Sequence, residues 1–186
     1  HNLNIKTTRS LANLSTAEKI QRETYEEGGI LVRVAKSHIR VGTFQLASLS
    51  KKQNDIEELL EYTINRLHPE ILNAEDKYLK FFEKITEDQI NLIIDWQRVG
   101  FIHGVMNTDN MSLSGETIDY GPCAFLDEYN PNKVFSSIDK NGRYAFNNQP
   151  KIALWNLARL AETFLHLVDS DAVSYTHLTL PTNREV

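Results

Sequence analysis

Apolar residues recur every three or four positions through the middle of the chain, which predicts a series of helices. The first predicted helix spans residues 54–67 and the second spans residues 74–84. Thr86 and Gln89 have the spacing of a capping box, which predicts the start of a third helix. Gly100 follows the last apolar position of that helix and predicts its end.

A fourth helix is predicted from Pro150, because proline suits a first helical turn. Its apolar stripe consists of Ile152, Trp155, Ala158, Leu165 and Val168. Before it, residues 130–148 are rich in Asn, Asp, Lys and Ser and predict a surface loop. Residues 116–118 predict a brief strand that delivers Asp119.

The front of the chain carries the strand signals. Residues 30–34 form a short β-branched run that predicts a strand, and the two glycines at 28–29 predict a turn before it. Residues 1–16 have the scattered pattern of the end of one element and a connector, and residues 37–44 suit a second strand or a turn into the helices. The predicted fold class is α+β, mostly helical with a few short strands at the front.

Composition excludes several classes of protein. The chain has 186 residues, enough for one domain or part of a larger one, and 41% are hydrophobic, enough for a core. The net charge of −5 argues against a nucleic-acid partner bound through bulk charge. Cys123 is the single cysteine, so no internal disulfide forms. No apolar run approaches the roughly 20 residues that span a bilayer, so no membrane partner is expected.

Residues 172–186 break from the helix that precedes them. Residues 173–182 can be written as a codon string that resembles a sequencing-library adapter. We therefore expect one partial domain over residues 1–171 and a non-native tail over residues 172–186. The alternative is a native Thr-rich strand.

Polar side chains that could serve as oxygen ligands or as a base gather within residues 100–127. They are His103, Asn107, Asp109, Asn110, Asp119 and Asp127. Asp and Asn oxygens are the ligands that Mg²⁺ prefers, and a loop of this kind is where phosphoryl-transfer enzymes hold metal and base.

A protein-kinase catalytic loop supplies a template for these residues. It carries His-Arg-Asp, an Asn five positions later that holds a metal, and a later Asp-Phe-Gly with a second metal ligand. On this template His103, Asn110 and Asp119 take the expected places, but Val105 stands where the catalytic Asp belongs. Asp109 is the nearest carboxylate that could accept a proton. The pattern therefore indicates a kinase-like site whose base is moved or lost.

Each part of this pattern also has an ordinary explanation. Asp109 and Asn110 suit a turn, Asp119 suits a cap, and His103 suits a core position. Two arginines, Arg33 and Arg40, stand seven positions apart and could grip phosphates with planar, bidentate forks. Spacing alone favours two solvated surface charges for this pair.

Five stretches of sequence carry a family resemblance: GFIHGVMNTDNMS, TIDYGP, FLD, RVAKSHIRVGTFQ and TTRSLA. Together they resemble the SelO (YdiU) family of protein adenylyltransferases over residues 7–168. Lys36 stands where that family commonly has proline or a small residue, and Cys123-Ala124 where Phe-Gly is frequent. Neither departure touches the expected chemistry.

The resemblance implies a protein-kinase-like fold, of which this chain is a fragment covering the end of the N-lobe and much of the mostly helical C-lobe. It implies that ATP lies reversed in the cleft and that AMP passes to a Ser, Thr or Tyr hydroxyl of a protein. Asp109 matches the general base. Asn110 and Asp119 match the ligands of Mg²⁺ or Mn²⁺. Arg33 and Arg40 match arginines that hold the nucleotide, which Asp119 also approaches through the metal.

The resemblance also implies missing parts. The glycine-rich loop, the ATP-positioning lysine and its glutamate partner belong upstream of the chain, and a redox-active cysteine or selenocysteine belongs downstream. We expect the fragment alone to be inactive, marginally soluble and open at its strand edges. The whole protein is expected in the cytoplasm of a bacterium or the mitochondrion of a eukaryote. A kinase-type phosphotransferase and a non-catalytic ATP-binding scaffold remain as alternatives.

Overall fold

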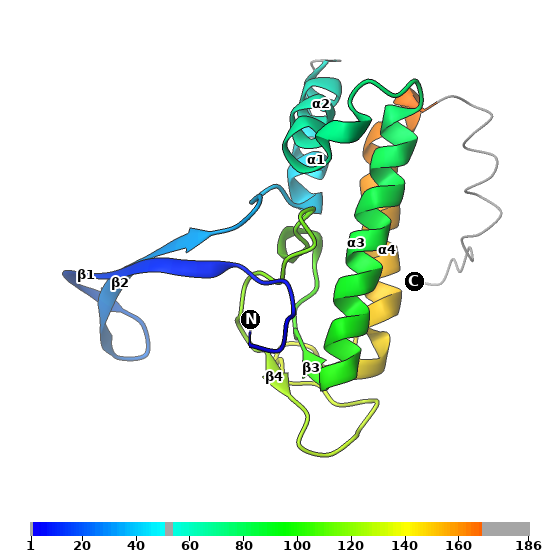
Figure 1. Cartoon of the computed structure of the whole chain (residues 1–186). Coiled ribbons are helices and arrows are strands. Elements are labelled where there is room, and N and C mark those ends of the chain that lie inside the picture. Colours follow the sequence, from blue (N-terminus) through cyan, green and yellow to red (C-terminus); the bar gives the residue numbers. More distant parts are fainter. Residues whose placement is uncertain (1, 51–53, 169–186) are drawn as a thin grey trace.

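The computed structural model describes residues 2–50 and 54–168, which form an α+β arrangement with two small antiparallel sheets (Figure 1). The α-helices pack together, and the longer hairpin projects away from them. The strands are β1 (Arg9–Gln21), β2 (Tyr25–Val34), β3 (Phe101–Ile102) and β4 (Ala124–Phe125). The α-helices are α1 (Val41–Ser48), α2 (Asp55–Leu67), α3 (Lys77–Val99) and α4 (Gln149–Phe164). The 3₁₀ turns are η1 (Pro69–Ile71), η2 (Thr108–Asn110), η3 (Phe146–Asn148) and η4 (Leu165–Leu167).

The hairpin of β1 and β2 differs from the prediction for the front of the chain. The expected connector is wrong because β1 begins at Arg9, and the glycines at 28–29 lie inside β2 and form no turn. A Cβ on Gly28 would lie 2.7 Å from Thr16 Oγ1, beside a register shift in the ladder. Glycine therefore serves the close approach of two strands here.

Both faces of this hairpin are open. The predicted strand over residues 30–34 is confirmed as the second half of β2. Among the described residues β1 and β2 pair only with each other, so each keeps one unpaired edge. The exposed apolar side chains of the hairpin are Leu11, Leu14, Ile20, Tyr25, Ile30, Leu31 and Val34. A two-stranded ribbon without a packed face is marginal by itself, so the expected exposure of strand edges and apolar surface is observed here.

The prediction of separate second and third helices is wrong, because α3 runs unbroken through the expected boundary. The capping box does not form. Thr86 Oγ1 has no hydrogen-bond partner among the described residues, and the Gln89 side chain donates to the Ser112 carbonyl at 2.7 Å. Since no Gly or Pro interrupts the segment, one apolar face continues along the whole helix. Gly100 ends it in the left-handed conformation, with φ 71°, as predicted.

The core lies where the four α-helices meet. The rings of Phe44 from α1, Phe81 from α3 and Phe164 from α4 pack with centroids 6.3–6.4 Å apart. The predicted helix over residues 54–67 is confirmed as α2, and α4 carries its proline in the first turn. The predicted stripe of the last helix is partly wrong, because Trp155 is 41% exposed. The buried apolar residues of α4 are Ile152, Ala153, Leu157, Leu160 and Phe164.

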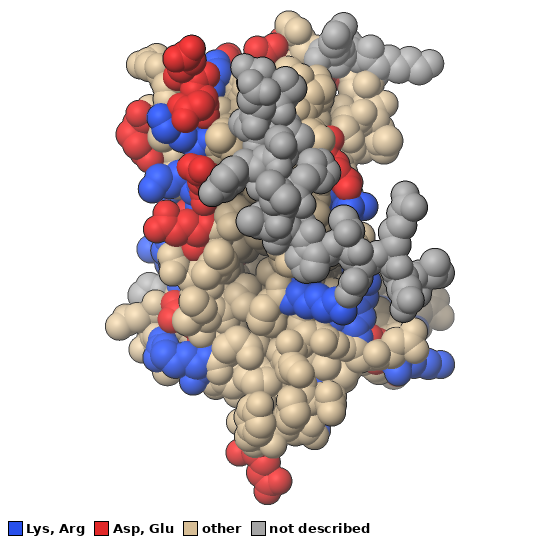
Figure 2. All heavy atoms as spheres, turned by 90° about the vertical axis from the view of Figure 1, so that its right-hand side faces the viewer, with Lys and Arg blue, Asp and Glu red and all other residues tan. Residues whose placement is uncertain are grey.

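An apolar groove of about 640 Å³ lies between α3 and α4. Ile90, Ile94 and Leu154 line it and are exposed. Figure 2 shows the side that lies to the right in Figure 1, with acidic and basic side chains mixed at the upper left and a largely uncharged lower centre. None of the helices within the described ranges has the length and apolar character needed to cross a bilayer. The expected tail over residues 172–186 lies outside the described residues.

Candidate active site

The loop that holds the predicted site is closed at its base by two short strands. β3 follows the end of α3 and pairs antiparallel with β4, so the two ends of residues 103–123 meet. The expected strand over residues 116–118 is only an isolated bridge between Thr7 and Thr117. Residues 130–148 are largely irregular, as predicted, until η3. The site loop is therefore short and anchored at both ends.

His103 is fully buried and joins the two halves of this loop. Its ring stacks on Trp96 at a centroid distance of 5.5 Å. Nε2–H donates to the Ile118 carbonyl at 2.7 Å, which leaves Nδ1 as an acceptor for the Val105 N–H at 3.4 Å. Its own N–H donates to Gln149 Oε1 at 3.0 Å. The ordinary explanation of a core histidine is confirmed, and this histidine fixes the residue that precedes Asp119.

Burial lowers the pKa of His103 below its ordinary value of 6.5, although the Ile118 hydrogen bond and the Asp119 charge oppose the shift. The unfolded chain therefore binds a proton at His103 more readily than the folded chain does. Neutral His103 contributes to the free energy of unfolding above about pH 6.5, and this contribution is lost as the pH falls below that value. We expect the melting temperature to drop across that range. His103→Asn should flatten this part of the profile in thermal unfolding followed by circular dichroism.

The matched control for this experiment is His38→Asn, because His38 is exposed. It should leave the pH profile of the melting temperature as in the parent chain. An equally steep profile in the His103→Asn variant would contradict the assignment of this pH dependence to the buried ring.

Asp109 and Arg40 come together although 69 positions separate them. Arg40 immediately precedes α1, and its Nη1 donates to the Asp109 carbonyl at 3.2 Å. The strand-like segment after η2 is joined to the start of α1 by Val41 N–H, which donates to the Met111 carbonyl at 3.1 Å. Arg40 Nε is buried and has no hydrogen-bond partner among the described residues. The Asp109 side chain is exposed. An exposed carboxylate and a buried, unsatisfied guanidinium donor thus belong to two residues that are in contact.

Asn110 presents one oxygen toward the same region. Its Nδ2 donates to the Val105 carbonyl at 2.9 Å, and its N–H donates to the Asn107 carbonyl at 3.0 Å. Its Oδ1 accepts no hydrogen bond from any residue that the structure describes. Asp109 and Asn110 do lie in a turn, η2, as the ordinary explanation has it. The turn leaves an amide oxygen and a carboxylate available for a ligand.

Asp119 adopts an uncommon backbone conformation, with φ 61°. Left-handed backbone in a residue other than glycine is a form of strain that clusters at functional sites. The flanking residues hold it, since the Ile118 carbonyl accepts from His103 and the Tyr120 hydroxyl is hydrogen-bonded to Thr7. The carboxylate itself is exposed. Burial, the largest cause, and the charge of Asp119 raise the pKa of the half-buried Cys123.

Arg33 stands apart from this group. It is an exposed residue of β2, opposite Ser10 in the ladder, and no contact with Arg40 is observed within the described ranges. Its role at the nucleotide stays a prediction. Across residues 2–50 and 54–168, no three His, Cys, Asp or Glu side chains gather where they could hold a metal ion. The metal site stays a prediction that depends on Asn110 and Asp119.

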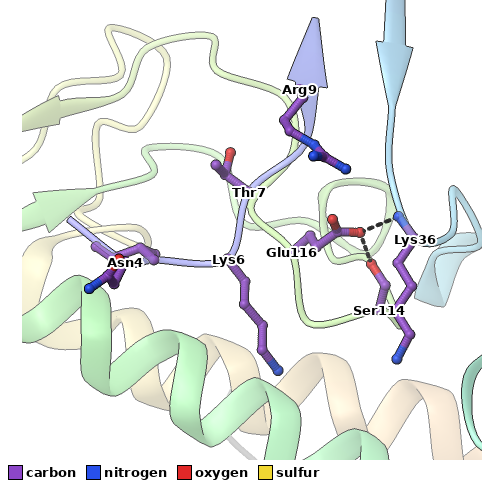
Figure 3. A pocket seen from close by; sticks show the side chains of 8 residues that line it. Asn4, Lys6, Thr7, Arg9, Lys36, Ser114 and Glu116 are labelled. Atoms are coloured by element: carbon purple, nitrogen blue, oxygen red, sulfur yellow. Dashed lines mark hydrogen bonds between the residues drawn. The ribbon is translucent and has the colours of Figure 1, made fainter. Parts of the chain in front are cut away.

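A separate polar pocket of about 450 Å³ lies beside the N-terminal segment and the end of the hairpin that is farther from its turn (Figure 3). It is lined by Asn4, Ile5, Lys6, Thr7, Arg9, Lys36, Ser114 and Glu116. The Glu116 carboxylate accepts from the Lys36 N–H and the Ser114 hydroxyl, both at 2.7 Å. Lys6 pairs with Asp88 at 2.8 Å. The charges of Glu116 and Lys6 in this pocket are thus satisfied by protein groups.

Two residues of the site region escaped the sequence reasoning. Gln149 bridges the loop base by accepting from the His103 N–H and donating to the Phe101 carbonyl at 2.9 Å. Gly42 lies against Asp109 at the start of α1. A glycine inside a helix is a signal in itself, since it weakens the helix unless a close contact requires it. No pattern in the sequence marks Gln149.

Carboxylate and amide oxygens in a loop after a helix, beside an arginine with a free donor, are typical of enzymes that transfer phosphoryl or nucleotidyl groups. The family profile described as protein adenylyltransferase SelO matches residues 1–179 of the chain. The chain belongs to this family, which confirms the resemblance.

Curated relatives agree with this assignment. The chain is 59% identical over 169 residues to the protein nucleotidyltransferase YdiU of Clostridium perfringens strain SM101. It is 58% identical over 171 residues to the protein of the same name from Shouchella clausii and 60% identical over 169 residues to that of Bacillus cytotoxicus. These alignments cover 91–92% of this chain but only 34–35% of the relatives. The chain thus spans about a third of their length.

Proposed function

We propose that the full-length protein transfers AMP from ATP to Ser, Thr or Tyr hydroxyls of proteins. Membership of the SelO family supports this proposal. The observation that carries it is the buried, unsatisfied Nε of Arg40, a residue whose Nη1 donates to the backbone carbonyl of Asp109. An unpaired buried donor is costly, and a phosphate oxygen of a nucleotide would satisfy it.

Each site residue has a part in this reaction. Asp109 accepts the proton of the target hydroxyl, whose oxygen attacks the α-phosphorus. The new bond joins that oxygen to AMP, and the bond from the α-phosphorus to the bridging oxygen breaks to release pyrophosphate. Arg40 directs its free Nε–H to a phosphate oxygen, and Arg33 holds the far end of the triphosphate. Protein donors thus fix the nucleotide while the carboxylate takes the proton.

Oxygen donors of the kind that Mg²⁺ or Mn²⁺ prefers are available at Asn110 and Asp119. The free Oδ1 of Asn110 and the exposed carboxylate of Asp119 fit such an ion. When bound, the ion would neutralise charge on the triphosphate. We further propose a protein-kinase-like fold, because helix, loop and last helix follow one another as they do around a kinase catalytic loop. The bacterial source of the named relatives favours a cytoplasmic location.

The test uses the full-length protein with a generic protein substrate and two forms of ATP. One form carries a label on the α-phosphate and the other on the γ-phosphate. We expect the substrate to retain the α-label alone. Retention of the γ-label would identify a kinase-type phosphotransferase, and retention of neither would favour a non-catalytic scaffold.

A further inference from the structure

Gly42 leaves no free space toward Asp109. A Cβ built on this glycine would lie 2.2 Å from Asp109 Oδ1 and 3.0 Å from Asp109 Cγ. Real Cβ atoms essentially never approach another heavy atom within 3.0 Å, so something must move, and the end of the Asp109 side chain moves at lower cost than the start of α1. The backbone of Gly42 is not in the left-handed region, and the conformation itself does not require glycine. The missing side chain serves the approach of Asp109.

The position that Asp109 occupies suits a carboxylate. α1 has no acidic residue of its own in the first turn, and its N-terminal end favours negative charge. The carboxylate of Asp109, which comes from the distant η2 turn, lies against this end of the helix. Arg40 holds the Asp109 backbone through its carbonyl, and Asn110 anchors the same turn to Val105. With the backbone held on both sides, the side chain is the part that must yield.

We infer that Gly42 is a positioning residue for Asp109, an inference that rests on the proposed function of Asp109 as general base. A methyl group at position 42 turns the carboxylate away from the place where it meets the target hydroxyl. A misplacement of about 1 Å at a reacting group lowers rates by about 10²-fold. The loss falls on the chemical step, because the donors that hold the nucleotide are left in place.

The experiment compares Gly42→Ala with Gly29→Ala in the full-length protein. Gly29 is a matched control, since its nearest heavy atom to an added Cβ lies at an ordinary 3.5 Å. Gly42→Ala should lower kcat for AMP transfer by about 10- to 100-fold with little change in KM for ATP. Gly29→Ala should leave both constants unchanged. In a background of Asp109→Asn, Gly42→Ala should cost little further activity, because the group it displaces no longer accepts a proton.

A second measurement does not depend on activity, so it remains informative if the variant folds poorly. Asp109→Ala removes the atoms that a Cβ at position 42 would strike. Gly42→Ala should therefore change the melting temperature less favourably in the parent than in the Asp109→Ala background, where the general preference of a helix for Ala over Gly acts alone. An equal cost in both backgrounds, or full kcat in Gly42→Ala, would overturn the inference while AMP transfer by the parent protein stands. A parent that transfers no AMP would overturn the proposed function and this inference together.

Discussion

Asp109→Asn in the full-length protein is expected to lower kcat for AMP transfer by about 10²- to 10⁴-fold, the range that general base catalysis contributes. Asn keeps the shape of the side chain beside Gly42 but cannot accept the proton of the target hydroxyl. The Arg40 hydrogen bond goes to the backbone carbonyl of Asp109, so the turn should remain in place. ATP affinity, measured by calorimetry, should stay close to that of the parent.

The control for this variant is Asp95→Asn. Asp95 pairs with Arg98 on the surface of α3 at 3.2 Å, and exposed pairs of this kind contribute little. Transfer should proceed at the parent rate in that variant. Undiminished kcat in Asp109→Asn would remove Asp109 from the role of base.

Asp119→Asn is the second variant with a large expected effect. Asn tolerates the left-handed backbone that Asp119 adopts at φ 61°, so the substitution changes charge with little added strain. Loss of an anionic ligand should raise the Mg²⁺ concentration that transfer needs and lower the rate by about 10³-fold, since a metal stabilises the transition state by several kcal/mol. Titration of Mg²⁺ and of Mn²⁺ in the transfer assay measures both effects.

Asp109→Asn serves as the reference for this titration, because it should lower the rate without shifting the metal dependence. The two variants thus separate the proton acceptor from the metal ligand. If the Asp119→Asn variant still performs the protein's function in the cell, that result would favour the non-catalytic scaffold.

Local signals predicted much of this fold. The spacing of Ile56, Leu60 and Ile64 predicted α2, and glycine at 100 marked the end of α3. Thr86 led to a wrong helix boundary, because a capping pattern stabilises a helix start less than a continuous apolar face stabilises the whole helix. The glycines at 28–29 misled because glycine serves turns and close strand approaches alike. The α+β class followed correctly from these elements.

The candidate site was predicted as a set of residues but not as an arrangement. The contact between Arg40 and Asp109 joins distant parts of the chain, and spacing along the sequence carries no information about it. The role of Gly42 depends on what lies opposite its Cα, which only the packing of η2 on α1 reveals. His103 is both a core histidine and part of the candidate site, since its buried ring also orders the site loop.

The hairpin of β1 and β2 has a consequence for how copies of the chain meet at high concentration. Its charged side chains concentrate toward the turn, at Glu18, Lys19, Arg22, Glu23, Glu26 and Glu27. Like charges and lysines near an open edge act as gatekeepers against strand addition by a neighbour. The half nearer the helices presents Leu11, Leu14, Ile30 and Leu31 with fewer such guards. Intermolecular β-pairing will therefore nucleate near the root of the hairpin, away from its tip.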